Sequence, residues 1–530
     1  MKNPNSPLQL KTANNIPVLT GLLFLVGYWV FGFDGITFSD DVYYLLAGKS
    51  FWAGTMEVNS YHFSSRWGAY VPSGLIGYIF GFHPHIISGF SLLSYLCTLF
   101  ILYQVLPDKK LTWILVIWFC TQVYFLHFLT KVYPDSALVL WVTIIPVAAS
   151  YRNKQPILSG TLLVLALFIG FLTKETIIFL APLVLILFLF DRKNKSVSAA
   201  FYVSLVISGL LLAGLYLAYF WIQFGDPLYR ITSINAGHYI SEFTYADKGF
   251  WSILERLTIT PITTFVERAY WPWLVFAIPG IYQGLKSKKS FEFTFALAFL
   301  CLFVGFWFMS STLEFYNPIY LNPRHLIILV PILAFLITIG WKTWQNSKQW
   351  KITLYTLISL GAIITAILGD EKQALFLCAF FPVIWIKNRT YQYALLGTIL
   401  LLPAIFSIYY QKQLKQYKNL TDTIESITQD IDKKTVIITN NFVHFSREIL
   451  IPGNKPAQEK LFPIESVEEL NQKLPKKIEV LIYDYYMHAY PKEEEDVEKL
   501  ENWLKMKNYQ LESEKELGNL QIRTYQLNSQ

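Results

Sequence analysis

The stretch PVLTGLLFLVGYWVFGF at residues 17–33 decides the fold, because it contains no charged side chain. About 20 apolar residues in a helix cross the hydrocarbon core of a bilayer. Similar apolar runs recur along the chain, which is 54% hydrophobic and only 15% charged, so the composition excludes an ordinary soluble domain. We therefore expect an integral, multi-pass α-helical membrane protein in which residues 17–33 are a retained span and not a cleaved signal peptide.

The apolar runs predict about 13 membrane spans. Their expected bounds are 17–33, 86–106, 111–129, 135–150, 156–172, 175–190, 199–222, 271–285, 291–309, 324–341, 352–368, 373–387 and 392–409. The run 73–82 is apolar too, but it is short and glycine-rich, so we expect it to be re-entrant or interfacial.

Positive charges indicate how the spans are oriented. Lys and Arg gather in alternate short loops, near residues 109–110, 152–154, 192–195, 286–289, 342–351 and 387–389. Such loops are usually cytoplasmic, which places the N-terminus in the cytoplasm. The long loops 34–72 and 223–270 then lie outside, and an odd number of spans puts the C-terminal tail outside as well. A bacterial inner or cell membrane is the expected location.

The composition changes near residue 411. Residues 411–530 carry 17 basic and 20 acidic side chains, whereas the whole chain has a net charge of +7. The hydrophobic pattern predicts strands at 435–439 and 478–483 and helices at 465–474 and 492–507. Alternation of apolar and polar residues predicts an edge strand at 521–527. We expect a membrane domain at 1–410 and a small extracytoplasmic α/β domain at 411–530, joined by a polar helix at 411–430.

The first external loop contains the sequence FSDDVYY at residues 38–44. A carboxylate at the membrane surface can act as a general base on an acceptor while a lipid substrate keeps its tail in the bilayer. Asp40 is the candidate base, and Asp41 is expected to tune it or to bind the acceptor. Tyr43 and Tyr44 are expected at the interface, where aromatic rings concentrate. The alternative is a solvated loop end or a helix cap formed by Ser39 and Asp40.

Asp135 follows Pro134 at the start of a predicted span. Proline favours the first turn of a helix, so Asp135 is either a third carboxylate in an acceptor cavity or an acid stabilised by the helix dipole.

The candidate phosphate-binding cations are Arg66, Lys174 and Arg324. A charge at bilayer depth usually faces a partner or a cavity, and arginine binds phosphate in a bidentate manner. For Lys174 the alternative is an ion pair with the adjacent Glu175. For Arg324 it is snorkelling to the interface.

Several function classes find no support. The eight histidines show no metal-ligand spacing, no nucleotide-binding or serine-hydrolase motif occurs, and no basic cluster interleaved with aromatic residues suggests nucleic acid. The sequence therefore requires no cofactor and predicts no dedicated metal site. A divalent cation held by two or three carboxylates stays open.

Taken together, these motifs resemble the polyprenyl-phosphate-sugar glycosyltransferases of the GT-C superfamily, in particular the branch of protein O-mannosyltransferases and aminoarabinose transferases (glycosyltransferase family 39-like). The matching segments are Asp40-Asp41 with Tyr43-Tyr44, RWGAYVP at 66–72, GYIFG at 77–81, TKE at 173–175 and NPRHL at 322–326 with Pro331. Asp41 replaces a glutamate of the family, His325 replaces an aromatic residue, and the family's Lys-Pro-Pro motif is absent, with Arg66 as a candidate substitute.

The resemblance implies an inverting glycosyltransferase of the cell envelope. It would transfer a sugar from a polyprenyl phosphate, of the undecaprenyl type in a bacterium, to an extracytoplasmic lipid, glycan or protein. Asp40 would take the acceptor proton, Asp41 or Asp135 would orient the acceptor, and the three cations would neutralise the leaving phosphate.

Two other classes remain as alternatives. The first is a lipid or solute transporter or flippase, which typically shows internal repeats and ionisable residues at mid-membrane. The second is a non-catalytic envelope-assembly protein, for which the Asp40-Asp41 pair would not be required.

Overall fold

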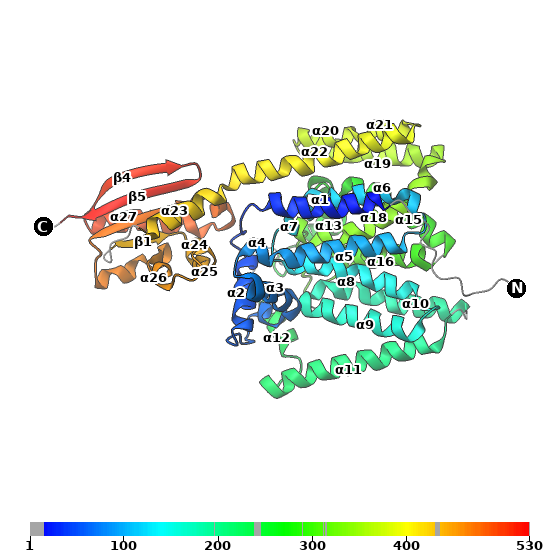
Figure 1. Ribbon diagram of the computed structural model, residues 1–530, viewed down its shortest axis with the longest axis horizontal. Helices are drawn as coiled ribbons and strands as arrows, with labels where there is room; N and C mark the ends of the chain where they lie inside the picture. Colours follow the sequence, from blue (N-terminus) through cyan, green and yellow to red (C-terminus); the bar gives the residue numbers. More distant parts are fainter. Residues whose placement is uncertain are drawn as a thin grey trace.

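The computed structural model describes residues 15–194, 197–237, 245–288, 290–310, 312, 315–429 and 435–528. Figure 1 shows a bundle of helices that lie roughly side by side and a smaller α/β domain at one end of it. We refer to the end that meets the α/β domain as the domain end of the bundle.

Apolar helices make up the first half of the bundle. They are α1 (Ile16–Gly32), α5 (Gly89–Val105), α6 (Thr112–Cys120), α7 (Val123–Leu129), α8 (Pro134–Ser150), α9 (Pro156–Thr173), α10 (Ala181–Asn194) and α11 (Ala199–Phe224). Prolines open α8 and α9, where the missing N–H has no helical partner in any case. The end of α11 is set by Gly225, whose φ of 69° suits glycine.

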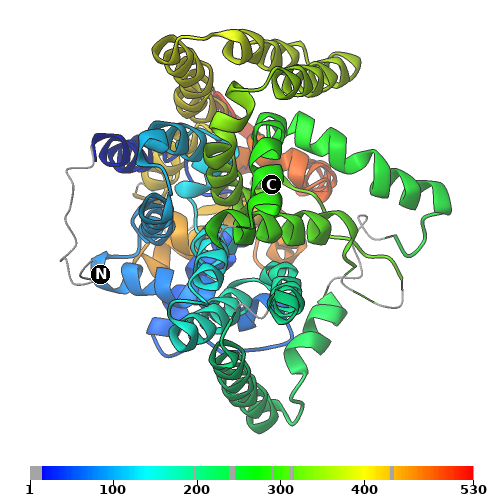
Figure 2. The same cartoon turned by 90° about the vertical axis from the view of Figure 1, so that its right-hand side faces the viewer.

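The second half contains the most deeply buried helix. Its long helices are α15 (Trp271–Ser287), α16 (Ser290–Phe308), α18 (Val330–Gln345), α19 (Lys348–Ile367) and α22 (Arg389–Lys415). Shorter helices are α12 (Tyr229–Gly237), α13 (Phe250–Thr258), α14 (Thr260–Glu267), α17 (Pro323–Leu326), α20 (Glu371–Cys378) and α21 (Phe380–Trp385). The apolar window that includes α18 is 89% buried, whereas that of α11 is 6% buried. Figure 2 accordingly shows α11 at the edge of the bundle.

Small residues let α15 and α18 approach each other closely. A Cβ atom at Gly280 would lie 1.9 Å from the carbonyl oxygen of Leu336, and one at Gly340 would lie 2.3 Å from the backbone of Gly280. Close backbone contact of this kind is how helices pack within a membrane, where no hydrophobic force drives them together.

Within the described residues, seven helices are long and apolar enough to cross a membrane, or eight if the bent pair α6 and α7 forms one span. The chain is thus a multi-pass membrane protein, while the count of about 13 spans stays a prediction. The predicted span at 111–129 is not one straight helix, because α6 and α7 meet at an angle of 73°. The predicted span at 175–190 begins as a 3₁₀ helix, η3 (Glu175–Leu180), before α10.

Ion pairs join loops that the charge pattern assigns to one side. Lys342 contacts Asp108 at 2.5 Å, and Arg152 contacts Asp191 at 2.7 Å. These contacts bring neighbouring basic loops together at the end of the bundle that lies away from the α/β domain.

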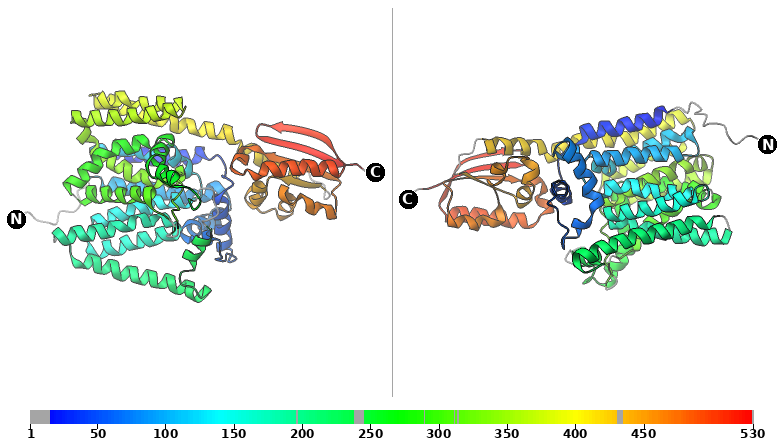
Figure 3. Two further views of the ribbon diagram at one scale, coloured as in Figure 1. Left: turned by 180° about the vertical axis from the view of Figure 1, so that it is seen from behind. Right: turned by 60° about the horizontal axis from the view of Figure 1, so that its bottom comes forward.

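Helices α2 (Asp40–Trp52), α3 (Trp67–Phe80) and α4 (Pro84–Ile87), with the 3₁₀ helix η1 (His62–Ser65), lie between the bundle and the α/β domain. Figure 3 shows them in blue at this junction. Gly48 and Gly74 let α2 and α3 touch, because a Cβ atom at Gly48 would lie 2.9 Å from Cα of Gly74. The run 73–82, expected to be re-entrant or interfacial, contributes the second half of α3.

The α/β domain contains one sheet of five strands in the order β2-β1-β3-β5-β4. The strands are β1 (Thr435–Thr439), β2 (Leu461–Pro463), β3 (Lys477–Tyr483), β4 (Tyr509–Leu517) and β5 (Leu520–Leu527). The helices are α23 (Tyr417–Gln429), α24 (Asn441–Phe445), α25 (Arg447–Leu450), α26 (Lys455–Gln458), α27 (Lys492–Met506), η5 (Ile464–Gln472) and η6 (Asp484–Ala489). Strand β1 pairs in parallel with β2 and β3, with Val436 opposite Ile478, whereas β5 is antiparallel to β3 and β4.

Most predicted elements of this domain are confirmed, but three of them differ in detail and strand β4 was missed. Strand β5 is an interior strand and not an edge strand, because β4 covers it. The sequence missed β4 because residues 510–516 are exposed, so no hydrophobic alternation marks them. The predicted helix 465–474 is the 3₁₀ helix η5. The polar helix 411–430 is two helices, since α22 continues to Lys415 and Gln416 (φ 48°) separates it from α23.

Candidate functional site

The site at the domain end begins with Asp40 and Arg324. Asp40 is the first residue of α2, and Arg324 lies in the first turn of α17, where the side chain of Asn322 accepts a hydrogen bond from its backbone N–H. Nη1 of Arg324 contacts Oδ2 of Asp40 at 2.9 Å. The Asp40 side chain is 25% exposed and that of Arg324 19%, so solvent and substrate can reach the pair.

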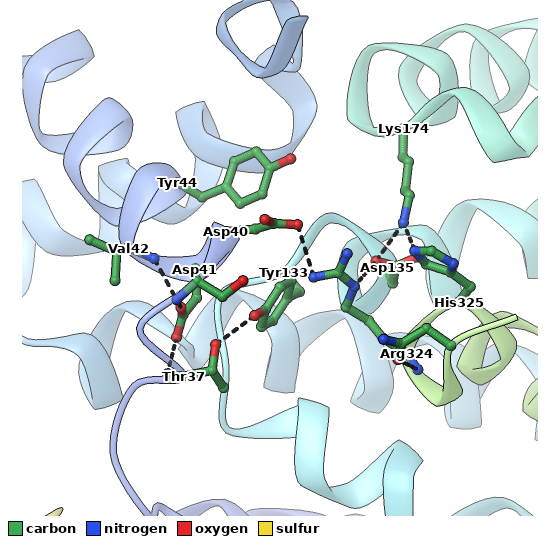
Figure 4. A network of polar contacts seen from close by, with 12 residues as sticks. Thr37, Asp40, Asp41, Val42, Tyr44, Tyr133, Asp135, Lys174, Arg324 and His325 are labelled. Carbon is green, nitrogen blue, oxygen red and sulfur yellow. Dashed lines mark hydrogen bonds and ion pairs between the residues drawn. The ribbon is translucent and has the colours of Figure 1, made fainter. Parts of the chain in front are cut away.

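A second carboxylate lies on the other side of the same guanidinium. Asp135, in the first turn of α8, is 3.6 Å from Nε of Arg324 and accepts hydrogen bonds of 2.7 and 2.9 Å from Nζ of Lys174 at the end of α9. Figure 4 shows these four side chains converging from four helix ends. We call Asp40, Arg324, Asp135 and Lys174 the Asp40 cluster.

One donor of the Asp40 cluster has only a long ionic contact, the 3.6 Å between Nε of Arg324 and the Asp135 carboxylate. Nε of Arg324 is buried and has no hydrogen-bond partner within the described residues. A buried donor without an acceptor costs about 1–3 kcal/mol, so this guanidinium gains from an additional acceptor such as a phosphate oxygen.

Asp41 is placed differently from Asp40. It is 1% exposed, and its carboxylate accepts hydrogen bonds from the backbone N–H groups of Thr37 (2.6 Å), Ser39 (3.1 Å) and Val42 (3.0 Å). Asp41 therefore closes the loop and caps α2. The alternative interpretation of the sequence gave this capping role to Ser39 and Asp40. The side chain of Ser39 makes no cap hydrogen bond. The predicted part of Asp41 in acceptor binding stays a prediction.

The alternative considered for Lys174, an ion pair with Glu175, is not formed, because Lys174 pairs with Asp135. Glu175 instead accepts a hydrogen bond of 2.7 Å from Arg66 and one of 2.7 Å from Arg230. Residues 174 and 175 point to different partners because the chain is extended at Lys174, with φ −162° and ψ 142°. Arg230, in the long loop 223–270, was not singled out from the sequence.

The Arg66 side chain is buried within the first external loop. It is 4% exposed, donates a hydrogen bond of 2.7 Å to the hydroxyl of Tyr44, and lies 4.3 Å from the ring centroid of Phe63. Tyr44 is fully buried beside it, so its ring packs against protein, and its expected place at the membrane interface stays a prediction. Tyr43 is partly exposed and packs on Tyr61 at 4.9 Å. The predicted role of Arg66 in donor binding stays a prediction.

Tyr133 connects the loop to the Asp40 cluster, although sequence reasoning missed it. Its hydroxyl contacts the hydroxyl of Thr37 at 2.5 Å, and the guanidinium of Arg324 lies 4.6 Å from its ring centroid (Figure 4). Its position next to Pro134 and Asp135, at the start of α8, is the signal that could have identified it.

A second ionic cluster lies in the same loop, six residues before Asp40. One oxygen of Asp34 contacts Nζ of Lys131, and the other accepts a hydrogen bond of 2.7 Å from Nζ of Lys415. His127 is 3.6 Å from the same carboxylate. A cavity of about 210 Å³ lies alongside, lined in part by Lys415, His127 and Tyr486. We call Asp34, Lys131, Lys415 and His127 the Asp34 cluster.

Metal ligands do not gather at either cluster. Among the residues that the structure describes, no three His, Cys, Asp or Glu side chains are arranged to hold a metal ion. The carboxylates of Asp40 and Asp135 are bridged by Arg324 instead.

Comparison with known proteins identifies the fold. The chain is similar to the crystal structure of ArnT from Cupriavidus metallidurans bound to undecaprenyl phosphate, with a TM-score of 0.60 and 10% sequence identity over 97% of this chain and 98% of that one. The apo structure of the same protein gives a TM-score of 0.59. The archaeal oligosaccharyltransferase AglB from Archaeoglobus fulgidus, in complex with an inhibitory peptide and a dolichol-phosphate, matches at a TM-score of 0.43 and 11% identity, covering 98% of this chain and 74% of that one.

A scan against protein-family models finds no match for the sequence, and a search of curated proteins finds none either. The structural similarity nevertheless extends over nearly the whole of both chains, including the α/β domain. The protein is therefore a multi-pass membrane protein that shares the fold of ArnT, in agreement with the sequence resemblance.

Proposed function

We propose that the chain is an inverting glycosyltransferase that moves a sugar from a polyprenyl phosphate to an acceptor outside the cytoplasm. One observation carries the proposal. A partly exposed carboxylate, Asp40, is paired with a guanidinium whose buried Nε makes no hydrogen bond within the described residues, at the end of a GT-C bundle. ArnT, which shares this fold, was crystallised with undecaprenyl phosphate.

In the proposed reaction the acceptor hydroxyl or amine attacks the anomeric carbon of the sugar. Asp40 takes the acceptor proton, and the bond between that carbon and the phosphate oxygen breaks with inversion. The lipid phosphate leaves with the bonding electrons, so no general acid is needed. Arg324 would shift its ionic contact from Asp40 toward the phosphate. This shift would stabilise the leaving group and leave Asp40 free to accept a proton. Lys174 would keep Asp135 ionised for orienting the acceptor.

The transfer is proposed to need no metal ion, since Arg324 and Lys174 can neutralise the phosphate. Activity that survives treatment with EDTA supports this point. Activity that is lost and then restored by added Mg²⁺ or Mn²⁺ would show that a cation completes the site.

The decisive experiment compares cells that lack the protein with cells that express wild-type or Asp40→Asn chains. Mass spectrometry of envelope lipids, glycans and glycoproteins should reveal one sugar modification that requires the wild-type chain. General-base catalysis contributes about 10²–10⁴-fold, so Asp40→Asn at equal expression should leave that modification nearly absent. Normal modification by Asp40→Asn would remove the catalytic assignment.

The same cells test the transporter alternative. The broken span at α6 and α7 is a feature that transporters share. Here, however, Thr121 and Gln122 at the break are buried, and the Gln122 side chain caps α7 by accepting a hydrogen bond from Phe125. Loss of a lipid from the outer leaflet, with sugar transfer intact in detergent extracts, would favour the transporter.

Labelling experiments test the proposed orientation. Ser60 and Ser426 are exposed at the domain end, so cysteines placed there should react with an impermeant reagent added to intact cells. A cysteine at Lys154, in a predicted cytoplasmic loop, serves as the protected control. Protection at both Ser60 and Ser426 would place the site on the cytoplasmic face.

A further inference from the structure

The loop that leads into Asp40 packs against the α/β domain. Phe38, two residues before Asp40, is 1% exposed although it belongs to a loop. Its ring is surrounded by aromatic rings of the α/β domain, with centroid distances of 5.2 Å to Tyr486, 5.4 Å to Phe442 and 5.8 Å to Tyr483. The first loop and the α/β domain thus share one hydrophobic core.

Hydrogen bonds from tyrosine hydroxyls to the backbone of the loop strengthen this contact. The hydroxyl of Tyr490 donates to the carbonyl of Phe38, and that of Tyr486 donates to the carbonyl of Ile36 at 3.2 Å. Burial, followed by the carboxylates of Asp41 and Asp40, raises the pKa of Tyr490 to about 12, so its hydroxyl keeps the proton that it donates. Tyr490 also stacks on Phe442 at 5.2 Å, which fixes its ring.

The backbone at Phe38 is strained. Its φ of 54° lies in the left-handed region, which costs a non-glycine residue free energy and persists only where the surroundings enforce it. The surroundings here are the α/β domain on one side and the Asp41 carboxylate, which holds Thr37 and Ser39, on the other. The strained residue directly precedes the turn into α2, so it determines the direction in which α2 and Asp40 begin.

The same loop reaches the cation that pairs with Asp40. Thr37, next to Phe38, contacts the hydroxyl of Tyr133, whose ring lies against the guanidinium of Arg324. The loop is therefore linked to both members of the pair, to Asp40 through the chain and to Arg324 through Tyr133.

We propose that the α/β domain positions the reactive loop, with Tyr490 and Phe38 as positioning residues that hold Asp40 against Arg324. This inference rests on the proposed function, because it assigns Asp40 the role of base. It gives the α/β domain a part in the reaction that does not require it to bind substrate.

The test removes one hydroxyl. Tyr490→Phe keeps the ring on Phe442 but deletes the hydrogen bond to the carbonyl of Phe38. Tyr509→Phe is the matched control, because Tyr509 donates an equivalent bond of 2.6 Å to the carbonyl of Pro475 within the same domain. A single neutral hydrogen bond changes an equilibrium by roughly 2- to 10-fold. We expect kcat to fall by about that factor in Tyr490→Phe, with the KM for the polyprenyl-phosphate sugar unchanged, and to stay at the wild-type value in Tyr509→Phe.

Two further measurements separate positioning from a general loss of stability. Hydrogen exchange of the amides in residues 36–41 should accelerate in Tyr490→Phe and stay unchanged in Tyr509→Phe. In an Asp40→Asn background, Tyr490→Phe should have no further effect on the residual kcat, because both changes act through the same carboxylate.

The outcomes are distinguishable. If Asp40→Asn retains full turnover, the proposed function fails. If Asp40→Asn is impaired but Tyr490→Phe matches Tyr509→Phe in turnover and exchange, only the positioning role is overturned. Equal losses in both tyrosine variants would overturn it too, since they would reflect the stability of the domain. Phe38→Ala removes the anchor itself and should lower kcat further than Tyr490→Phe in protein that still binds undecaprenyl phosphate.

Discussion

Asp34 and Asp40 lie six residues apart in the first external loop and both form ion pairs with Lys or Arg side chains, yet their surroundings differ. The Asp34 side chain is 1% exposed, and each of its oxygens faces a lysine. The Asp40 side chain is 25% exposed, and its one ion pair within the described residues is with Arg324. The first carboxylate has both oxygens occupied, whereas the second has an accessible face.

This difference indicates which acid does chemistry. A buried carboxylate between two ammonium groups holds segments together, because removing any member leaves a buried charge without compensation. Lys415 lies in α22 and Lys131 in the loop before α8, so Asp34 ties the first loop to both. A base must instead accept a proton and release it, which requires access. On this ground we propose Asp40, and not Asp34, as the base.

The largest expected effect on stability is that of Asp34→Asn. Loss of one partner from a buried pair costs about 3–5 kcal/mol. The control is Asp108→Asn, whose pair with Lys342 is exposed and therefore contributes about 0–1 kcal/mol. Denaturant unfolding in detergent at pH 7 measures both changes. Wild-type stability in Asp34→Asn, together with lost turnover, would reverse the assignment of the two acids.

The pH dependence sharpens the same comparison. Burial alone would raise the pKa of Asp34, but the charges of Lys131 and Lys415 outweigh it and hold that pKa well below its ordinary value. A group with a depressed pKa stabilises the fold above its unfolded-state pKa, which is about 3.9 for aspartate. This stabilisation is lost as the pH falls below that value. The unfolding free energy of the wild type should thus fall below about pH 4 more steeply than that of Asp34→Asn.

An intermediate effect is expected at Arg324. Hydrogen bonds to charged groups contribute about 1.5–3 kcal/mol, so Arg324→Ala should weaken binding of undecaprenyl phosphate by roughly 10- to 100-fold. Arg324→Lys should lose less, since it keeps the charge without the planar fork. The thermal shift caused by added lipid measures affinity, and Arg523→Ala, far along the chain in β5, is the control. A full lipid-induced shift in Arg324→Ala would exclude Arg324 from the donor site.

The sequence predicted the features that depend on local pattern. Apolar runs located most helices. Asp40 was singled out as one of two adjacent acids beyond a predicted span, and Arg324 because it follows Asn322-Pro323 at the start of another. The ion pairs were not predictable, because their partners are distant in the chain. Asp34 meets Lys415 across 381 residues and Arg66 meets Glu175 across 109. Which of two acids in one loop is buried depends on these distant partners.

The smallest effect is expected at Asp41, which lies next to the base but resembles Asp34 in its burial. Its carboxylate accepts three backbone N–H groups at the start of α2. Asn would keep one acceptor oxygen and lose the charge, so Asp41→Asn should cost about 1 kcal/mol of stability, as for other helix caps. In Asp41→Asn the loop holds Asp40 less firmly, so turnover should fall. The fall should be smaller than in Asp40→Asn, which keeps the cap but removes the proposed base. Melting curves and single-turnover rates of the two variants, measured side by side, decide the order. If Asp41→Asn abolished turnover at wild-type stability while Asp40→Asn did not, the proton acceptor would be Asp41, and the exposure of Asp40 would have no catalytic meaning.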